Sequence, residues 1–580
     1  MAFPLVGKGQ GLDSIPMVSH YKMAATSAPF SLKPWSRSLK KITSNSTLQI
    51  WKTELTQDFY RSGFAGFALD STPVMAQDTQ LIIWKEGPRF IWKTLRLDSV
   101  HPEAKSYGQW KKTGKPNHVF NQEEIERKFT QTLIWYQNRG YPFAGFQKSS
   151  LELDTFTSQT VGVSAKYQLI SGKSFTIDSL HIEGKIRESS RFVSSLVRIK
   201  PGDIYNHEAI ENIPLILNNS IYYQNVDNPQ IYYHQNSAEI WLKLNPRKSS
   251  RIDGVLGFLP PIDSTAKVQL TGLLDFQLVS PLGIGELVAL KFEQLPGSSQ
   301  RLSIKYNQPY WFGTPIKSQL EFQLQKQDSS FVTRWIRVSP GWQFSRNISL
   351  FAFVRFRNSV LLSTRNWEKS KIPPPVLDSK DQLAGLGFEF EKLDYKLNPS
   401  NGFIFKIDYG TGFKQIFRNP GLDSLDYNSI TTWLPKQEFH LETWWFTRTF
   451  KRQVLVLGNR SFKLQQSEYF RNDLAQIGGA RLLRGFNENQ FFTNAYTVFS
   501  FEYRYLLDKN SHVLLFYDLS QIVLTEQGRR SVQTPKGVGV GINFETRAGI
   551  LNLTFASGQI GQEAFNFARP RVHLGIVSQF

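Results

Sequence analysis

The chain has 580 residues, a formal net charge of +20 and no cysteine. Its length predicts two or more domains, and the lack of cysteine excludes disulfides, thiolate metal sites and cysteine catalysis. Aromatic residues make up 14% of the chain, yet no apolar run approaches the roughly 20 residues of a membrane helix, which leaves a large soluble β protein or a membrane β-barrel.

The N-terminal segment, residues 1–47, has no clear strand or helix pattern, and we interpret it as a partial module or an extension. It begins "MAFPLVGKGQGL", without the basic start and continuous apolar core of a signal peptide.

Helical and strand periodicities alternate from residue 48 to residue 248. The clearest helix is "NQEEIERKFTQTLIWYQNRGY", in which Asn121 can cap the first turn and Gly140 ends the last. A similar helix pattern, "LTQDFYRSGFAGFALD", ends at Gly63. Because helix and strand patterns recur at a similar spacing, the sequence predicts a string of small α/β modules, at residues 48–94, 95–172 and 173–248.

From residue 249 to residue 580 the helical pattern gives way to segments of about ten residues with period-two alternation. In "KSQLEFQLQ", Leu320, Phe322 and Leu324 alternate with polar residues. We count about 16 such segments, and an even number of antiparallel strands can close without a lipid-facing edge. The prediction is a membrane all-β barrel of about 16 antiparallel strands, preceded by α/β modules. The alternative is a soluble β-sandwich or propeller with its aromatic residues in a core.

The chain ends inside the last predicted strand, on an aromatic residue. Counting back by twos from Phe580 places Ile576, Leu574 and Val572 on one mostly apolar face. Such an ending suits a barrel whose final strand pairs with its first. We interpret these four residues as a C-terminal strand signal.

The stretch "GGARLLRGFNENQ" interrupts the strand pattern within the segment 463–490. Gly478 and Gly479 allow the chain to bend back, and Gly485 allows the tip to pack closely. A barrel of this size encloses a water-filled lumen. We expect the segment to fold inward, where the guanidinium of Arg484 can form bidentate pairs with carboxylates.

Two carboxylates in the following strands are candidate partners of this arginine. Glu502 in "FSFEYRY" points inward if its two aromatic neighbours face lipid. Asp518 in "LLFYDLSQ" shares a face with Phe516, so we expect it to point inward only with a local twist or at a strand end.

These motifs resemble a known family. Arg484-Gly485-Phe486 is similar to the Arg-Gly-Phe/Tyr tip of the inward loop in the BamA/TamA superfamily of outer-membrane β-barrel assembly proteins. Glu502 and Phe516-x-Asp518 match, in order, a glutamate and an aromatic-x-aspartate on the family's next two strands.

The resemblance extends over about residues 48–580. The Gly-rich segment 537–558 and the terminal aromatic residue look like the family's penultimate hairpin and chain end, and the N-terminal modules look like its periplasmic POTRA domains. In length and module number the chain is most similar to the TamA type.

The resemblance implies no bond-breaking chemistry and no cofactor. It implies a protein of the bacterial outer membrane, with its modules in the periplasm, that inserts unfolded client outer-membrane proteins. Client strands would be templated at a seam between the first and last barrel strands, where Gly254, Gly257 and Gly575 would weaken the pairing. The implied partners are outer-membrane lipid, the clients, and periplasmic or lipoprotein subunits.

Other functions remain open. A polypeptide translocator of the two-partner secretion type would share the fold but have an open lumen, and a soluble β-rich binding protein belongs to another class. No Gly-x-Ser-x-Gly elbow, His-Glu-x-x-His site or phosphate-binding Gly-Lys motif occurs, so we expect no catalytic or metal-binding residues. The basic residues are scattered and no nucleic-acid-binding motif accompanies them, so we expect no nucleic-acid partner.

Overall fold

The computed structural model describes most of the chain. The described residues are 20–25, 45–71, 79–111, 113–157, 159–259, 269–294, 299–365, 367–369, 372–396, 398–422, 425, 427, 430–480, 482–526, 529–546, 549–567 and 570–579. Within these ranges no helix combines the length and the apolar character needed to cross a membrane.

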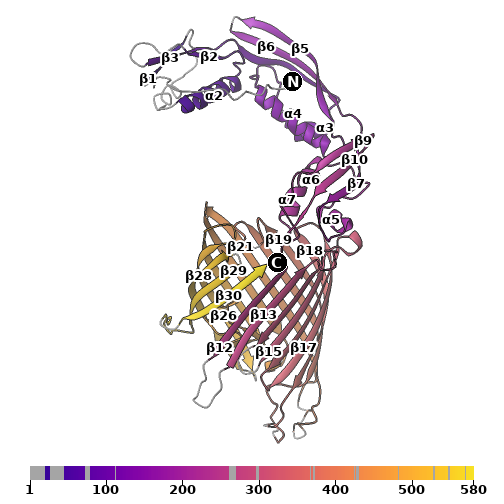
Figure 1. Cartoon of the computed structure of the whole chain (residues 1–580), viewed down its shortest axis with the longest axis vertical. Helices are drawn as coiled ribbons and strands as arrows, with labels where there is room; N and C mark the ends of the chain where they lie inside the picture. Colours follow the sequence, from indigo (N-terminus) through magenta and orange to yellow (C-terminus); the bar gives the residue numbers. More distant parts are fainter. Residues whose placement is uncertain are drawn as a thin grey trace. The chain divides into compact units, whose positions relative to one another are not determined.

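The chain divides into two compact units. The first comprises Met1–Asp178, Pro201–Glu211 and Tyr232–Glu239, and the second comprises Ser179–Lys200, Asn212–Ile231 and Ile240–Phe580. Figure 1 labels the helices and strands that form the three N-terminal modules and the barrel.

The first module consists of one helix and a small sheet. Its elements are β1 (His20–Ala25), α2 (Asn45–Arg61), β2 (Ala68–Ser71) and β3 (Thr79–Lys85), in sheet order β1-β3-β2. Leu55, Phe59 and Ile82 are almost fully buried in the core. The sequence indicated no strand before residue 48, but β1 pairs in parallel with β3. Local periodicity does not reveal a short strand whose partner is far away in the chain.

The second module has the strand–helix–helix–strand–strand order. It comprises β4 (Arg89–Asp98), α3 (Pro102–Tyr107), α4 (Gln122–Gln137), β5 (Gly145–Thr157) and β6 (Thr160–Ile170), in sheet order β4-β6-β5. The Asn121 side chain caps α4 by accepting a hydrogen bond of 3.0 Å from the Glu124 amide. Because β4 pairs in parallel with β6, the expected module boundary at residue 94 lies inside a strand, and the sheet of the second module begins at Arg89.

The third module contains two small sheets and three short helices. They are β7 (Thr176–Glu183), α5 (Ser190–Val197), α6 (His207–Glu211), α7 (Ile213–Asn218), β8 (Tyr223–Gln224), β9 (Gln230–His234), β10 (Ser237–Lys243) and β11 (Asn245–Pro246). The sheet orders are β7-β10-β9 and β11-β8.

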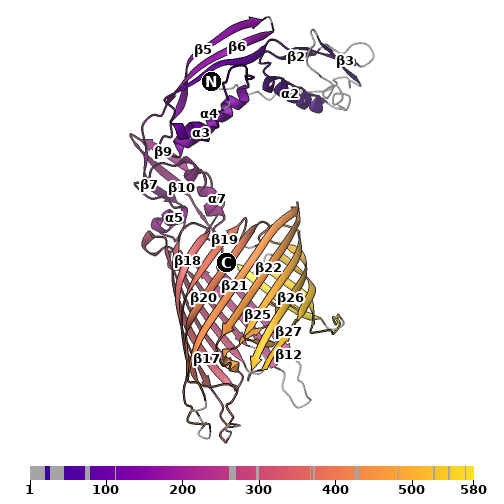
Figure 2. The ribbon, with the colours of Figure 1, turned by 180° about the vertical axis from the view of Figure 1, so that it is seen from behind.

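The remainder of the second unit is a closed antiparallel barrel, in which β30 returns to β12. Its strands are β12 (Arg251–Leu259), β13 (Gln269–Val279), β14 (Leu287–Gln294), β15 (Gln300–Gln308), β16 (Ile316–Gln327), β17 (Phe331–Gln343), β18 (Ile348–Leu361), β19 (Ser379–Leu393), β20 (Gly402–Ile416), β21 (Trp433–Phe450), β22 (Gln453–Gln465), β25 (Ala495–Leu506), β26 (His512–Glu526), β27 (Arg529–Gln533), β28 (Lys536–Thr546), β29 (Gly549–Gln559) and β30 (Arg571–Gln579). Figure 2 shows the wall formed by β18 to β26.

The 17 strand segments occupy 16 positions around the wall. Both β27 and β28 pair with β26, one after the other along its length, so they form a single interrupted position. At the interruption Ser520 donates a backbone hydrogen bond of 3.0 Å to the Pro535 carbonyl. The predicted barrel of about 16 strands is confirmed, and the sequence missed only the outer segment β27.

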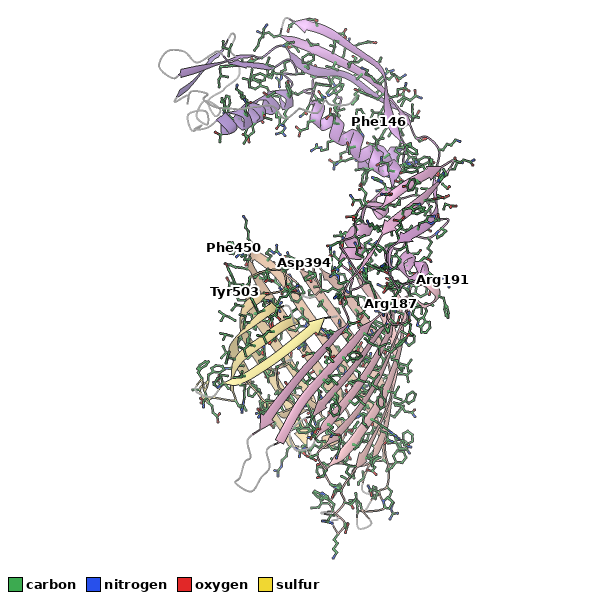
Figure 3. All side chains as sticks on the ribbon, in the orientation of Figure 1. Phe146, Arg187, Arg191, Asp394, Phe450 and Tyr503 are labelled. Atoms are coloured by element: carbon green, nitrogen blue, oxygen red, sulfur yellow. The ribbon has the colours of Figure 1, made fainter. Side chains whose placement is uncertain are left out.

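Side chains alternate between the two faces of the wall, as a barrel requires. On β25, Phe501 and Tyr503 are exposed on the outer face, and Glu502 between them is buried on the inner face. Figure 3 shows Tyr503 on the outside of the barrel. Below, the module end means the end at which β12 begins at Arg251, and the distal end means the other.

Candidate functional site

The connection between β22 and β25, residues 466–494, starts at the distal end and folds into the lumen. It contains a 3₁₀ turn (Arg471–Asp473) and the short paired strands β23 (Ala475–Ile477) and β24 (Phe491–Thr493). The sequence placed this inward loop at 463–490. The start was wrong by three residues because Lys463 to Gln465 still pair in the barrel wall, and the loop continues to Asn494.

Arg484 is bound by two carboxylates of the barrel wall. Its Nε and Nη2 donate to the two oxygens of Asp518 at 2.8 and 2.6 Å, and its Nη1 donates to Glu502 at 2.7 Å. Its backbone amide also donates to Asp518, at 3.1 Å. The Asp518 side chain is fully buried and those of Arg484 and Glu502 are nearly so. Bidentate pairs of this kind fix orientation as well as charge.

Phe516 completes this arginine site. Its ring lies under the guanidinium, 3.7 Å from ring centroid to Cζ of Arg484, and it is buried. The expectation that Asp518 needs a twist or a strand end to point inward was wrong. Both Phe516 and Asp518 lie on the inner face of β26 by regular alternation, because the aromatic ring stacks on the cation and does not face lipid.

A second arginine neutralises the remaining charge. Arg504 donates to the other oxygen of Glu502 from Nε at 2.9 Å and from Nη2 at 2.6 Å. Two cations and two carboxylates therefore alternate along one buried row. The sequence analysis missed Arg504, although its position two residues after Glu502 in one strand places both on the same face.

Gly485 lets the arginine tip lie directly against the wall. Its φ is +90°, and a Cβ there would lie 2.7 Å from the backbone of Ser557 on β29. On the adjacent strand β28, a Cβ on Gly537 would collide with the Arg484 carbonyl. The Gly-rich hairpin 537–558 thus supplies the flat surface on which the tip rests.

The two glycines at the start of the motif reverse the chain. Gly478 and Gly479 have φ of +126° and +95°, a region that side chains disfavour. The Glu488 carboxylate lies over Gly479 and accepts a hydrogen bond of 2.9 Å from the Ala480 amide. The loop therefore closes on itself before its tip reaches the wall.

Phe486 anchors the apolar side of the loop. Its ring packs edge-on against Phe491, with centroids 5.1 Å apart. It belongs to a buried cluster with Ile477, Leu483, Val498 and Ile522, which come from the loop, β25 and β26.

A second anchor, absent from our sequence analysis, holds the first part of the loop. Asp473 accepts hydrogen bonds from Lys414 of β20 at 2.6 Å and from Gln466 at 2.8 Å. The side chains of Asp473 and Lys414 are completely buried. Arg357 of β18 lies 3.8 Å from the same carboxylate and donates to the Asn472 carbonyl.

The wall around this second anchor is also charged. Lys436 of β21 contacts Asp381 of β19 at 2.6 Å and Glu438 at 3.2 Å, and Arg355 contacts Glu438 at 2.6 Å. Arg357 pairs with Asp381 at 3.3 Å. Each of these strands contributes one or two inward charges, and the loop carboxylate adds to the negative charge among them.

Polar contacts connect the loop to a third part of the wall. Gln476 exchanges hydrogen bonds of 3.1 Å with Gln325 and Gln327 of β16, and Asn489 accepts from Arg301 of β15 at 3.5 Å. Beside the loop remains a lumen cavity of about 320 Å³, whose lining includes Arg301, Trp335, Arg355, Glu438 and Tyr496. The loop thus crosses the lumen and contacts three parts of its wall.

The seam between β12 and β30 is short. It comprises three residue pairs, Arg251 with Gln579, Ile252 with Ser578 and Asp253 with Val577. By contrast, β12 pairs with β13 over nine residues and β30 pairs with β29 over seven. All three seam pairs lie at the module end.

The three glycines assigned to the seam lie beside its hydrogen-bonded ladder, not in it. Gly254 follows the last paired residue of β12, Gly257 pairs with Thr271, and Gly575 pairs with Asn552. They lie where the ladder between β12 and β30 has already ended, and their weakening of the pairing stays a prediction.

The expected C-terminal signal falls only partly within the described residues. Val572 is 54% exposed on the outer surface. Leu574 and Ile576 belong to β30, but their side chains, like the whole of Phe580, lie outside the described residues. Among the residues that are described, no three His, Asp or Glu side chains are grouped to hold a metal ion.

No family model matches the sequence, and no curated protein matches it. Solved structures do match. BamA from Haemophilus ducreyi lacking POTRA domains 1–3 is 15% identical, with a TM-score of 0.50 over 85% of this chain and 99% of that one. CdiB from Acinetobacter baumannii is 13% identical, with a TM-score of 0.52 over 96% and 100%. CdiB from Escherichia coli is 14% identical, with a TM-score of 0.50 over 92% and 98%.

These likenesses show the fold. They confirm the expected membrane barrel with preceding POTRA-like modules and do not support a closer relation to the TamA type.

Arg484→Ala should destabilise the barrel by about 3–5 kcal/mol, because it leaves Asp518 buried without its cation. The measurement is the urea midpoint of heat-modifiable gel migration. Arg529→Ala, at an exposed arginine of β27, is the matched control and should change stability by less than about 0.5 kcal/mol. Equal midpoints for the two variants would contradict the assigned role of Arg484.

Asp473→Ala should be similarly costly, because it leaves Lys414 buried and uncompensated. Combined with Arg484→Ala, it tests whether the loop acts as one body. We expect the double variant to lose less stability than the sum of the single losses, by more than about 0.5 kcal/mol, because each anchor restrains the other. Additive losses would show that the two anchors are independent.

Proposed function

Because the chain has the POTRA-and-barrel fold of BamA and CdiB, we propose that it resides in the bacterial outer membrane and inserts client β-barrel proteins there. Its modules would lie in the periplasm, and its partners would be membrane lipid, unfolded clients and accessory periplasmic or lipoprotein subunits. The proposed role breaks no covalent bond and needs no cofactor.

The short seam carries the proposal. An unfolded strand that enters hydrocarbon exposes unpaired backbone groups, each of which costs several kcal/mol. When a client strand replaces the pairing of β12 with β30, the wall gives up only three residue pairs. Any other opening of β12 or β30 breaks at least seven. Client strands would therefore add at the seam and pair there before they meet lipid.

The charged anchors support the same role. A wall that opens at one seam needs its shape fixed elsewhere. Arg484 connects the inward loop to β25 and β26, and Asp473 connects it to β18 and β20. The loop thus connects strands of the wall that lie away from the seam.

The second module offers a suitable edge for a client strand. The strand β5 is at the edge of its sheet. On it Leu151 and Leu153 are 47% and 57% exposed. An edge strand with unpaired backbone groups and exposed apolar side chains favours strand addition by an extended peptide. We assign first contact with unfolded clients to this edge.

A disulfide across the seam should block insertion. Ile252 and Ser578 are paired there, and the chain has no other cysteine to interfere. Oxidised Ile252→Cys/Ser578→Cys protein should fail to insert a client barrel into vesicles and recover on reduction. The control is Ser303→Cys/Gln323→Cys, which links β15 to β16 at another paired position. Insertion by the oxidised seam variant would rule out this mechanism.

The translocator alternative predicts a different electrical property. Because the inward loop crosses the lumen and is bound to several strands of its wall, we expect low conductance from the protein in a planar bilayer. A large and steady conductance would contradict the insertase and favour secretion of a polypeptide through the lumen. The Arg484→Ala variant provides the comparison, since a released loop should increase the conductance.

A further inference from the structure

A surface formed by α5 and three barrel turns is rich in basic and exposed apolar side chains that have no part in client insertion. The turns are residues 280–286, 309–315 and 344–347, at the module end of β13 to β18, and together with residues 185–200 they are called the α5 face below. The Ser189 amide donates to the Gly283 carbonyl at 2.9 Å. The whole surface belongs to one compact unit.

The α5 face is held together by close packing. The Phe192 ring of α5 occupies the space where Gly285, with φ of +80°, would carry a Cβ. The Tyr222 hydroxyl donates to the Gly285 carbonyl at 2.7 Å. A side chain at Gly285 would push the helix off the turn, so the helix and the barrel rim present one fixed surface.

This surface is strongly basic. Residues 185–200 contain five cations, Lys185, Arg187, Arg191, Arg198 and Lys200, and one carboxylate. That carboxylate, Glu188, accepts a hydrogen bond of 3.3 Å from the Tyr223 hydroxyl. The turn at 280–286 adds one carboxylate, Glu286, which is buried and accepts hydrogen bonds from the Leu282 and Ile284 amides. Figure 3 shows Arg187 and Arg191 beside the module end of the barrel.

Two arginines meet at the centre of the α5 face. Arg198 donates to the carbonyls of Gln343 and Phe344, both at 3.0 Å, and Arg346 donates to the Val197 carbonyl at 3.3 Å. Burial and the neighbouring charge of Arg198 lower the pKa of Arg346. In the part of the chain that the structure describes, neither guanidinium has a carboxylate partner. The two adjacent guanidinium groups therefore donate to carbonyl oxygens, and among the described residues their positive charges are not balanced by a paired carboxylate.

Apolar side chains project from the tips of the same three turns. Leu282, Phe312 and Phe344 are 74%, 81% and 58% exposed. Phe312 and Tyr310 both have left-handed φ, of 52° and 49°, which bulky residues adopt only when their surroundings impose it. The turn therefore keeps the Phe312 side chain exposed, although its left-handed backbone conformation is strained.

The apolar tips continue the lipid-facing wall. Beside them Ile316 and Trp342, at the ends of β16 and β17, are also exposed on the outer surface. Strand ends of a membrane barrel lie at the level of the lipid headgroups, where aromatic residues gather. A phosphate at this level would lie within reach of basic residues next to the barrel rim.

We propose that the α5 face binds the headgroup phosphate of anionic glycerophospholipids in the adjoining leaflet. Arg198 and Arg346 hold the phosphate oxygens, and Leu282, Phe312 and Phe344 insert among the acyl chains. Guanidinium groups match phosphate geometry, and basic residues beside a membrane attract anionic lipid. An acidic protein segment would satisfy the arginines but would leave the three apolar tips in water. The inference rests on the membrane-spanning barrel and is independent of client insertion.

The first test measures which lipids stay with the full-length protein. It is reconstituted in phosphatidylcholine that contains a minority of phosphatidylglycerol, then extracted, and its bound lipids are quantified. Arg198→Gln/Arg346→Gln should lower the enrichment of phosphatidylglycerol on the order of tenfold, because each basic residue near the surface contributes. The matched control is Arg529→Gln/Arg530→Gln, two exposed arginines of β27, which should retain the enrichment.

Two outcomes of this test overturn the proposal: unchanged enrichment in Arg198→Gln/Arg346→Gln, or an equal loss in the control. Because the readout is bound lipid, a failed lipid site leaves the insertion assay unaffected, and the two proposals can fail separately.

The second test does not depend on the folding of the arginine variant. Because the chain has no cysteine, a nitroxide can be attached at Phe312→Cys alone, and at Tyr503→Cys on the lipid-facing wall as the reference. In vesicles, the label at residue 312 should be more accessible to oxygen than to an aqueous nickel complex, as at residue 503. Accessibility to the aqueous complex only would show that the turn lies in water and would overturn the proposal.

Discussion

The buried carboxylates of Glu502 and Asp518 on the inner wall need a cation, and the position of the inward loop depends on this requirement. Without Arg484, two adjacent strands would carry two buried acids with only Arg504 to compensate them. The inward loop therefore supplies the cation that balances the buried carboxylates of the barrel wall. Because the guanidinium makes directional bonds to both acids and stacks on Phe516, it fixes the orientation of the loop as well as its charge.

The loop presents a positive charge to one part of the wall and a negative charge to another. Its arginine meets an acidic pair on β25 and β26, whereas its aspartate meets the cations Lys414 and Arg357 of β20 and β18. A loop with this arrangement cannot be docked the other way round without placing like charges together. The charge pattern thus specifies one pose, and the Gly-rich hairpin 537–558 lets the backbone approach closely enough to adopt it.

The sequence predicted those features that depend on alternation along one strand. Period-two patterning predicted the barrel and the inward direction of Glu502, and Asp518 was named as a second candidate partner, which the family resemblance matched. Contacts between distant segments were not predictable in this way. Alternation places Lys414 and Asp381 on an inner face, but it does not show that Asp473 of the loop pairs with Lys414 or that Asp381 pairs with Lys436. The short seam was hidden for the same reason, since the offset between β12 and β30 is fixed only when the whole sheet closes. Phe516 was misjudged because an aromatic residue on a barrel strand was assumed to face lipid.

The three seam pairs all lie at the module end of β12 and β30. Beyond Asp253, β12 continues for six residues to Leu259, and none of them pairs with β30 in the described part of the chain. An incoming strand that pairs first along this free length would gain hydrogen bonds before any native pair is broken. It could then displace the last three pairs one at a time, so that the wall never has to open completely, and the energy barrier would be spread over many small exchanges.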